Sequence, residues 1–356
     1  MAIKSLIINP GSTSTKIAVF EGKEKLFDTT LRYSTEELAS FGWVMEQVDF
    51  RRATIEKALA DNNIDPDSLD AICARGGQVP YCAAGTYRVD QAMVDFMYTR
   101  RHGAHASNLG CVLALLLAKP LGIPAYIVDP VMVDEMDDAA RISGMPMCPR
   151  KPVFHALNQK ATARLHCERM GWVYEESNLI VAHMGGGISV AAHKQGRIVD
   201  VNNALDGDGP FAPDRAGSIP SSELIKVCFS GQYTKEELLK FISSKGGLVA
   251  YLGTNSVIQV MERIAQGDQR AKKVLDAMCY NIVKQIGAMA AALSGSVQAI
   301  VLTGGIAYNE PVVEYIRERC SFIAPIAVYP GENELEALVT NALVVLRGVI
   351  TPKVYK

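Results

Sequence analysis

Short apolar runs alternate with segments of helical periodicity along the whole chain. In the helical segments, apolar residues recur three and four positions apart, as they do on one face of a helix. This alternation is typical of an α/β protein with parallel or mixed sheets. The expected strands are 5–9, 16–21, 71–75, 125–129, 179–183, 189–193, 299–303 and 326–329, and the expected helices are 45–61, 108–119, 158–169, 222–229, 235–243, 271–293 and 335–347.

The length of 356 residues allows two domains. The best candidate for a linker is Pro149-Arg150-Lys151-Pro152, because its prolines prevent a helix or strand from continuing through it. Residues 6–22 and 179–196 share one plan of strand, glycine turn, strand and hairpin, with Gly11 and Gly185 at matching places. This repetition predicts that a strand-loop-strand unit was duplicated, with one copy opening each domain.

Charge and hydropathy exclude some partners. The formal net charge is −2 and the pI is about 6.3, so a basic footprint for nucleic acid is absent. The longest uncharged stretch, 285–309, is long enough for a bilayer span, but glycines and polar residues interrupt it. The first residues lack the apolar core of a secretion signal. We therefore expect a cytoplasmic protein without membrane or nucleic-acid partners.

The eight cysteines are never closer than nine positions, so no C-x-x-C pair is available for zinc or redox chemistry. Cys73, Cys111, Cys228 and Cys279 have apolar neighbours, which favours buried, reduced thiols over disulfides. His102-Gly103-Ala104-His105 has the spacing of a weak metal pair, but no second pair completes a site. A transition metal is not expected.

A phosphate-type loop follows the first expected strand. Gly11-Ser12-Thr13-Ser14-Thr15-Lys16 combines four hydroxyls with a glycine and a lysine. Backbone N–H groups in a tight turn, hydroxyl donors and one cation suit phosphate oxygens. The spacing is not that of a Walker A loop, and a strand follows instead of a helix. A Ser/Thr-rich hairpin turn is the alternative interpretation.

Two further glycine turns, Gly185-Gly186-Gly187 and Thr303-Gly304-Gly305-Ile306-Ala307, follow expected strands. Glycine lets the backbone approach a ligand closely, and α/β sheets bind ligands where strands end. The string 207–212 matches G-x-G-x-x-A but has no preceding strand, so it is not taken as a dinucleotide fingerprint. Three glycine loops indicate a triphosphate held between two domains.

Charged residues also stand at strand ends. Arg75 ends an apolar strand just before a glycine pair, and Arg215 lies in Asp214-Arg215-Ala216-Gly217-Ser218. Both are candidates for binding phosphate, and structural salt bridges are the alternative. Asp129 ends the strand at 125–128 and is a candidate ligand of Mg²⁺, which takes one or two carboxylates together with phosphate and water.

The motifs together resemble those of butyrate kinases, which are relatives of acetate kinase in the superfamily of acetate and sugar kinases, heat-shock chaperones and actin. The resemblance opens with Ile8-Asn9-Pro10-Gly11-Ser12-Thr13-Ser14-Thr15-Lys16 and extends over essentially the whole chain. The other matching motifs, in the expected order, are Ala74-Arg75-Gly76-Gly77, His105-Ala106-Ser107-Asn108, Val128-Asp129-Pro130, Phe154-His155-Ala156-Leu157-Asn158, His183-Met184-Gly185-Gly186-Gly187, Asp214-Arg215-Ala216-Gly217-Ser218, Thr303-Gly304-Gly305-Ile306-Ala307 and Pro330-Gly331-Glu332-Asn333-Glu334.

The resemblance implies two ribonuclease-H-like domains of the actin-like ATPase type with a nucleotide cleft between them. The first would comprise residues 1–150 and the final helix 333–356, and the second 151–332. It also implies reversible transfer of a phosphoryl group from ATP to a short-chain fatty acid, with ATP/ADP and Mg²⁺ as cofactors and an acyl phosphate as product. Relatives associate through the second domain, so a homo-oligomer, a dimer or larger, is expected.

The resemblance also implies roles for single residues. Arg75 and Arg215 would flank the transferring phosphoryl group, and His155 would contact it in the transition state. The residues expected around nucleotide and phosphates are Asn9, Ser12, Ser14, Lys16, His183, Gly185, Gly186, Gly187, Gly304, Gly305, Ile306 and Asn309. The residues expected near the metal are Asn9, Asp129, Glu332 and Glu334.

The sequence departs from acetate kinases at two of these places. Where those enzymes have Asn-Gly, this chain has Gly186-Gly187, so a side-chain contact to phosphate is lost. The glutamate that they place near magnesium corresponds to Glu332 or Glu334, and an ungapped alignment puts Asn333 there instead. The choice between the two glutamates stays open at this point.

An acid acceptor suits this set of residues. A carboxylic acid with a pKa of about 4 is already ionised at neutral pH, so the reaction needs no general base. A kinase acting on a hydroxyl would need one, and Asp129 or Asp214 would then serve. A non-metabolic ATPase of the same fold is a further alternative. Butyrate is expected over isobutyrate, propionate or acetate from the resemblance alone; Val79, Pro80, Met184 and Phe211 are apolar candidates for lining the acyl pocket.

Overall fold

A computed structural model describes residues 3–99 and 105–355. The chain forms two compact units. Unit 1 contains the residues up to Val133 together with those from Asn333 onwards, and unit 2 runs from Asp134 to Glu332. Among the residues described, no helix combines the length and the apolar character needed to cross a bilayer.

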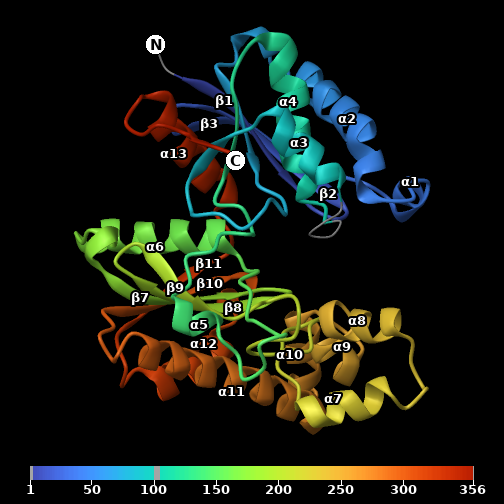
Figure 1. The fold of residues 1–356 in the computed structure, drawn as a ribbon, viewed down its shortest axis with the longest axis vertical. Coiled ribbons are helices and arrows are strands. Elements are labelled where there is room, and N and C mark those ends of the chain that lie inside the picture. Colours follow the sequence, from blue (N-terminus) through green and yellow to red (C-terminus); the bar gives the residue numbers. More distant parts are fainter. Residues whose placement is uncertain (1–2, 100–104, 356) are drawn as a thin grey trace. The chain divides into compact units, whose positions relative to one another are not determined.

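A seven-stranded mixed sheet forms the centre of unit 1 (Figure 1). The second strand runs antiparallel to the first and third, and the fourth and sixth run parallel to the first. The order across the sheet is β12-β5-β6-β4-β1-β2-β3. The strands are β1 Lys4–Pro10, β2 Ser14–Glu21, β3 Glu24–Arg32, β4 Ala71–Arg75, β5 Thr86–Arg88, β6 Ala125–Val128 and β12 Lys353–Val354.

Helices cover both faces of this sheet. Helix α4 (Asn108–Leu121) packs on β1, β4 and β6, with α2 (Val48–Asp61) and α3 (Gln91–Tyr98) beside it. Helix α13 (Glu334–Leu346) packs on the same strands from the other side (Figure 1). The last helix of the chain thus completes the unit that the first strand begins. The shorter segments are α1 Thr35–Ala39, η1 Val44–Gln47 and η2 Pro66–Ser68.

A five-stranded sheet forms the centre of unit 2, in the order β11-β10-β7-β8-β9. Its antiparallel and parallel pairs match those of the strands β6-β4-β1-β2-β3 in unit 1. The repeated plan seen in the sequence is therefore a repeated sheet topology. The strands are β7 Asn178–Met184, β8 Ile188–Lys194, β9 Arg197–Val201, β10 Ala299–Gly304 and β11 Ile326–Pro330.

Alternate residues of β7 face different helices. Leu179 and Val181 pack in the core beneath α6 (Ala156–Met170), whereas Ile180 and Ala182 pack in the core on α11 (Gln269–Ala292). The two helices lie on opposite faces of the sheet (Figure 1). This alternation places His183 on the α6 face. The other helices of unit 2 are α5 Asp138–Arg141, η3 Tyr174–Glu176, α7 Ser221–Cys228, α8 Lys235–Ser243, α9 Gly247–Leu252, α10 Val257–Ala265, η4 Gly305–Tyr308 and α12 Glu310–Cys320.

The expected α/β class is confirmed, and all eight expected strands and seven expected helices are present. The strands that the sequence did not indicate, β3, β5, β9 and β12, are short or lie at or near sheet edges. In β3, every residue is exposed or half-buried, so its apolar pattern is weak. Helix α4 continues past Lys119 through Pro120 to a left-handed cap at Gly122.

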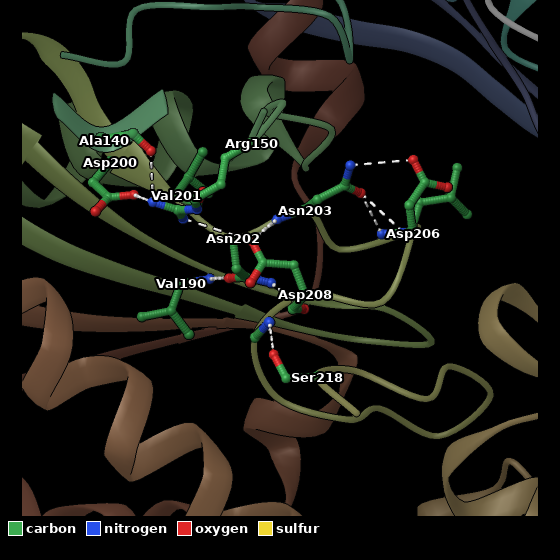
Figure 2. Close-up of polar contacts among 12 residues, drawn as sticks. Ala140, Arg150, Val190, Asp200, Val201, Asn202, Asn203, Asp206, Asp208 and Ser218 are labelled. Atoms are coloured by element: carbon green, nitrogen blue, oxygen red, sulfur yellow. Dashed lines mark hydrogen bonds and ion pairs between the residues drawn. The ribbon is translucent and has the colours of Figure 1, made fainter. Parts of the chain in front are cut away.

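The proline-rich stretch 149–152 lies within unit 2 and does not separate the units, which divide after Val133. Electrostatic contacts hold this part of the chain to the second sheet. The Arg150 guanidinium lies 3.0 Å from Asp200 Oδ1 and donates hydrogen bonds to the carbonyls of Ala140 and Val201 (Figure 2). Burial raises the pKa of Asp200 above its ordinary value, although Arg150 opposes that shift.

All eight cysteines are free thiols. Cys73, Cys111 and Cys279 are buried, and burial raises the pKa of each thiol. The expectation for Cys228 was wrong, because this residue is exposed. Helix α7 has no buried residue, so the apolar neighbours of Cys228 do not belong to a core.

Candidate active site

Three neighbouring strands of unit 1 bring candidate residues to one edge of its sheet. Asn9 lies at the end of β1, Arg75 ends β4, and Asp129 directly follows β6. These strands are adjacent and parallel, so their carboxyl ends share one edge, where α/β sheets bind ligands. Lys16 on β2 is directly opposite Asn9 in the antiparallel ladder, and its side chain is exposed.

Glu334 joins this group from the other end of the sequence. It is the first residue of α13 and only 4% exposed. Its Oε2 accepts a hydrogen bond from Asn9 Nδ2 at 2.5 Å and lies 3.2 Å from Arg75 Nη1. The positive end of the helix dipole favours a carboxylate in the first turn. Glu334 is thus a buried anion held by an amide, a guanidinium and a helix end.

The backbone of the phosphate-type loop is held by Arg51, a residue of α2 that lies outside the sequence motifs. Arg51 is fully buried, and its guanidinium donates to the carbonyls of Gly11, Ser12 and Ser14 at 2.8–3.1 Å. Burial lowers the pKa of this guanidinium. Because the Arg51 guanidinium binds these carbonyls, the loop keeps a fixed shape. Ser12 is exposed in this loop, and Ser14 is half-buried. The sequence carries no local signal for Arg51, because the contact spans about forty positions.

Asp129 has a clear structural role. Its backbone lies in the left-handed region, with φ of 37°, and its side chain is 2% exposed. Oδ1 accepts a hydrogen bond from the Gly85 N–H at 2.7 Å, and the Asp129 N–H donates to the Gly85 carbonyl at 3.0 Å. Asp129 therefore connects the end of β6 to the segment that precedes β5.

In unit 2, two histidines are stacked at the start of α6. His155 precedes this helix, and its ring lies parallel to that of His183, with centroids 3.7 Å apart and planes at 10°. His155 Nδ1 lies 2.9 Å from Ser189 Oγ. Ser189 and His183 are paired directly across β7 and β8, so their side chains share one face and His155 covers both.

His183 is only 1% exposed and has oxygen atoms near both ring nitrogens. Nδ1 lies 2.8 Å from Asn158 Oδ1, and Nε2 lies 3.3 Å from Glu332 Oε1. The two glutamates that the sequence could not separate therefore have different surroundings. Glu332 lies beside a histidine in unit 2, whereas Glu334 is bound by Asn9 and Arg75 in unit 1.

The turn 185–187 has no room for a side chain at its last position. A Cβ on Gly187 would collide with Arg215 Nη1, which donates to the Ala204 carbonyl at 2.5 Å. Gly185 and Gly187 also close a tight turn through a backbone hydrogen bond of 3.0 Å. Burial lowers the pKa of Arg215, and neighbouring Asp214 acts in the opposite direction. The structure thus brings the second glycine loop and Arg215 together.

The loop that carries Arg215 begins at Asn202, which anchors it to the sheet (Figure 2). The Asn202 side chain accepts from the Val190 N–H at 2.8 Å and donates to the carbonyls of Ile188 and Asp208. Asn202 is completely buried. Its amide replaces ladder hydrogen bonds where the chain leaves β9, so the loop starts from a defined position.

The third glycine loop lies at the end of β10, next to β7. A Cβ on Gly304 would collide with the Met184 carbonyl, and φ at Gly304 is 87°. Within the described residues of unit 2, a pocket of about 570 Å³ opens beside this turn. Five predicted nucleotide residues line it, together with a segment that the motifs did not indicate. The lining is Gly185, Gly186, Gly305, Ile306 and Asn309, with Pro213, Tyr308 and Asn255 to Ile258.

Of the apolar candidates for an acyl pocket, Met184 is fully buried in the core of unit 2. Phe211 is half-buried and packs against Tyr251. Val79 and Pro80 line a separate pocket of about 210 Å³ in unit 1. No three His, Cys, Asp or Glu side chains gather as a metal cluster among residues 3–99 and 105–355, and His102 lies outside these ranges.

Comparison with known proteins decides the family. Residues 148–336 match the model of the acetokinase family. The whole chain is 51% identical to butyrate kinase 2 of Clostridium acetobutylicum over 356 residues, which cover 100% of both proteins. The chain belongs to the acetate kinase family. It is accordingly a kinase. A further relative is a probable butyrate kinase of Listeria monocytogenes, which is 48% identical over the full length of both chains.

Solved structures show the same fold at low sequence identity. Acetate kinase from Porphyromonas gingivalis superposes with a TM-score of 0.81 at 21% identity, covering 97% of this chain and 100% of that chain. A propionate kinase from Francisella tularensis superposes with a TM-score of 0.77 at 16% identity, covering 95% and 98%. These matches and the two repeated sheets confirm the actin-like ATPase fold expected from the sequence.

Proposed function

We propose that this kinase of the acetate kinase family transfers the γ-phosphoryl group of ATP to butyrate, reversibly, giving butanoyl phosphate and ADP. The observation that carries the proposal is full-length identity of 51% to a butyrate kinase. The residues of the structure agree with it, since each unit presents a partly buried arginine, Arg75 or Arg215, beside a glycine turn.

The transfer is proposed to be direct and in line. The ionised carboxylate attacks phosphorus, the bond to the bridging oxygen of ADP breaks, and no protein nucleophile takes part. Such a reaction depends on positioning and on stabilising charge on the equatorial oxygens. Arg75 and Arg215 would offset the repulsion between the two anions. His155 would donate a hydrogen bond to the phosphoryl group in the transition state.

The remaining roles follow the two units. Asn9, Ser12, Ser14 and Lys16 would bind phosphate oxygens at the loop that Arg51 supports. In unit 2, the pocket of about 570 Å³ is suited in size to a nucleoside. The adenosine would occupy this pocket, with its phosphates along the turns at His183, Gly185 to Gly187 and Gly304 to Gly305.

The donor set also fits a magnesium ion, which supplies charge neutralisation on the phosphates when bound. Hard cations prefer oxygen ligands, and Mg²⁺ typically keeps several waters and takes only one or two carboxylates. Glu334 is a buried carboxylate with Asn9 beside it, so these two residues would hold the ion. Asp129, at the end of β6, would be a further ligand of the ion. Glu332, which lies beside His183, would be near the ion on the nucleotide side in unit 2.

The last part of the proposal is the length of the acyl chain of the substrate. A methylene group contributes about 0.8 kcal/mol in an apolar pocket, so butyrate, isobutyrate, propionate and acetate differ by small steps. Butyrate is favoured because the full-length relatives at 48–51% identity are named for it.

We also infer that the enzyme assembles as a homo-oligomer, which sedimentation velocity would test.

Hydroxylamine trapping tests the proposal. Acyl phosphates react with hydroxylamine to give hydroxamates, whereas sugar phosphates do not. ATP turnover should be coupled to hydroxamate formation and should be maximal per mole of substrate with butyrate across straight and branched acids of two to six carbons. A maximum with acetate would overturn the butyrate assignment. Turnover without any hydroxamate would favour a kinase acting on a hydroxyl, and hydrolysis without an acceptor would favour an ATPase.

A further inference from the structure

A chain of buried hydrogen bonds runs through unit 2 to the ring of His155. Tyr174 and His193 lie at its far end, with 2.9 Å between Tyr174 Oη and His193 Nδ1. Gln159 comes next, its Oε1 3.0 Å from His193 Nε2. Gln159 then contacts Ser189, whose Oγ lies 2.9 Å from His155 Nδ1. His193, Gln159 and Ser189 are fully buried, so water does not compete for these bonds.

The direction of the chain is fixed at Gln159. One amide atom of this side chain lies 3.0 Å from the Ser189 carbonyl oxygen and 2.8 Å from Ser189 Oγ. A backbone carbonyl can only accept a hydrogen bond, so this amide atom must be the NH₂ nitrogen. The other atom of the amide is therefore the oxygen, and it accepts from His193 Nε2.

His193 is consistent with that direction. Burial and the nearby charges of Lys160 and Arg164 lower its pKa well below the ordinary value, so the ring is neutral. A neutral ring that donates from Nε2 must accept at Nδ1, where the Tyr174 hydroxyl supplies the hydrogen. The Tyr174 hydroxyl therefore donates its hydrogen bond to His193, and His193 donates to Gln159, so both hydrogen bonds point toward His155.

The same direction can continue through Ser189. Its Oγ accepts a hydrogen bond from the Gln159 amide, and its single hydrogen can be donated to a further acceptor. His155 Nδ1, 2.9 Å away, lies within hydrogen-bond distance of it and can accept that hydrogen. A nitrogen that accepts carries no hydrogen, and the hydrogen of a neutral imidazole ring then resides on the other nitrogen, Nε2.

We propose that Ser189, oriented by Gln159, is a positioning residue that holds His155 as the neutral tautomer with its hydrogen on Nε2. The proposal rests on the function proposed above, in which His155 meets the transferring phosphoryl group. That group is anionic, so an N–H directed at it is attractive and a nitrogen lone pair is repulsive. The stack on His183 fixes the plane of the ring, and Ser189 fixes which nitrogen carries the hydrogen.

Nitrogen NMR of the full-length enzyme, labelled with ¹⁵N-histidine, tests the tautomer directly. Only six histidines are present, and the spectrum of His155→Gln identifies the His155 signals by their loss. We expect wild-type His155 to be protonated at Nε2 and unprotonated at Nδ1 at pH 8. A hydrogen on Nδ1 in the wild type would overturn the proposal.

Substitution at Ser189 tests the cause. In Ser189→Ala, we expect a mixture of His155 tautomers and a kcat lower by about tenfold, the rate equivalent of one hydrogen bond, with both KM values within about twofold. Ser189→Thr keeps the hydroxyl and should restore the Nε2–H tautomer and most of the rate. Ser177→Ala is the matched control, because Ser177 is a buried serine of unit 2 that donates to the Val173 carbonyl. We expect it to change neither readout.

An unchanged tautomer in Ser189→Ala would contradict the proposal. If that variant does not fold by circular dichroism, Ser189→Cys replaces it, since a thiol is similar in size and a weaker donor. Wild-type values of both the tautomer and kcat in Ser189→Cys would then be the contradicting outcome. Failure of the proposed function is separable, because an enzyme without butyrate turnover still reports its His155 tautomer by NMR.

Discussion

Glu332 and Glu334 are two positions apart in the sequence but contribute to different units. Glu332 lies 3.3 Å from His183 Nε2 in unit 2, and Glu334 accepts from Asn9 Nδ2 at 2.5 Å in unit 1. The chain leaves unit 2 for unit 1 between these residues, after Glu332. The two carboxylates therefore have distinct roles, and substitution can separate them.

Glu334→Gln should lower kcat by about a hundredfold, in the range seen when one electrostatic contact to a transition state is removed. The concentration of Mg²⁺ at half-maximal rate should also rise, because the amide is a poorer ligand than the carboxylate. Steady-state rates over a magnesium titration provide the measurement. The control is Glu336→Gln on the same helix, an exposed residue that pairs with Lys25, and it should change kcat by less than about twofold. If the magnesium dependence of Glu334→Gln equals that of the wild type, Glu334 is not a ligand of the magnesium ion.

Arg75→Ala and Arg215→Ala should each lower kcat by orders of magnitude, since each removes a cation from the transferring phosphoryl group. Far-ultraviolet circular dichroism should be unchanged, because both side chains are partly exposed, one at the end of β4 and the other in the loop between β9 and α7. Turnover near the wild-type value in either variant would contradict the proposed mechanism.

Gly187→Ala should resemble Arg215→Ala, because the new methyl group would occupy the place of the Arg215 guanidinium. The double variant Gly187→Ala/Arg215→Ala should then lose little more activity than Arg215→Ala alone. Two residues that act through the same contact give non-additive effects in such a cycle. Rates measured for all four proteins complete the cycle, and fully additive losses would show that Gly187 acts independently of Arg215.

Arg51→Met should destabilise the protein by about 3 kcal/mol, because it leaves the loop carbonyls without the donor that satisfies them in a buried place. The neighbouring Arg52→Met is the control. Arg52 is half-buried and forms ion pairs of 3.5 and 3.9 Å with the exposed carboxylates of Asp49 and Glu56, and its loss should cost less than about 1 kcal/mol. Urea denaturation measures both values, and similar losses in the two variants would refute the role given to Arg51.

Stability should fall as the pH drops below about 6.5, the ordinary pKa of histidine. The pKa of His193 is far lower in the folded protein than in the unfolded chain. Below pH 6.5 the unfolded chain therefore binds a proton that the folded protein does not, and the unfolding free energy falls by up to about 1.4 kcal/mol per pH unit. His193→Gln should reduce this slope between pH 6.5 and 5 in urea denaturation. Equal slopes in the two proteins would mean that His193 is already protonated when folded.

The sequence predicted the parts of the site that depend on local order. Arg75, Asp129 and the loop at Gly11 stand at strand ends, and periodicity locates strand ends well. It did not reveal Arg51 or Ser189, because their partners lie about forty and thirty-four positions away. Which buried polar groups pair depends on tertiary packing, and a single sequence gives no pattern for it.

The uncertainty over Glu332 and Glu334 has a related cause. Both residues lie at the point where the chain passes from one unit to the other, so a shift of two positions changes the unit to which a side chain belongs. The misplaced linker has a different explanation. Prolines at 149 and 152 end local structure, but the ion pairs of Arg150 with Asp200 and of Glu135 with Lys160 attach residues 134–152 to the rest of unit 2.

The position of Arg51 on α2 couples that helix to ligand binding at a distance. The guanidinium contacts loop carbonyls, while the side chain of Ser12 is exposed and that of Ser14 is half-buried. A ligand that binds the loop only in its ordered form stabilises that form. It therefore raises the free energy of local unfolding of the loop and of α2, whose Arg51 holds the loop. Amide hydrogens of α2 should therefore exchange more slowly when nucleotide is bound. A helix without a ligand contact of its own would thus report occupancy of the loop.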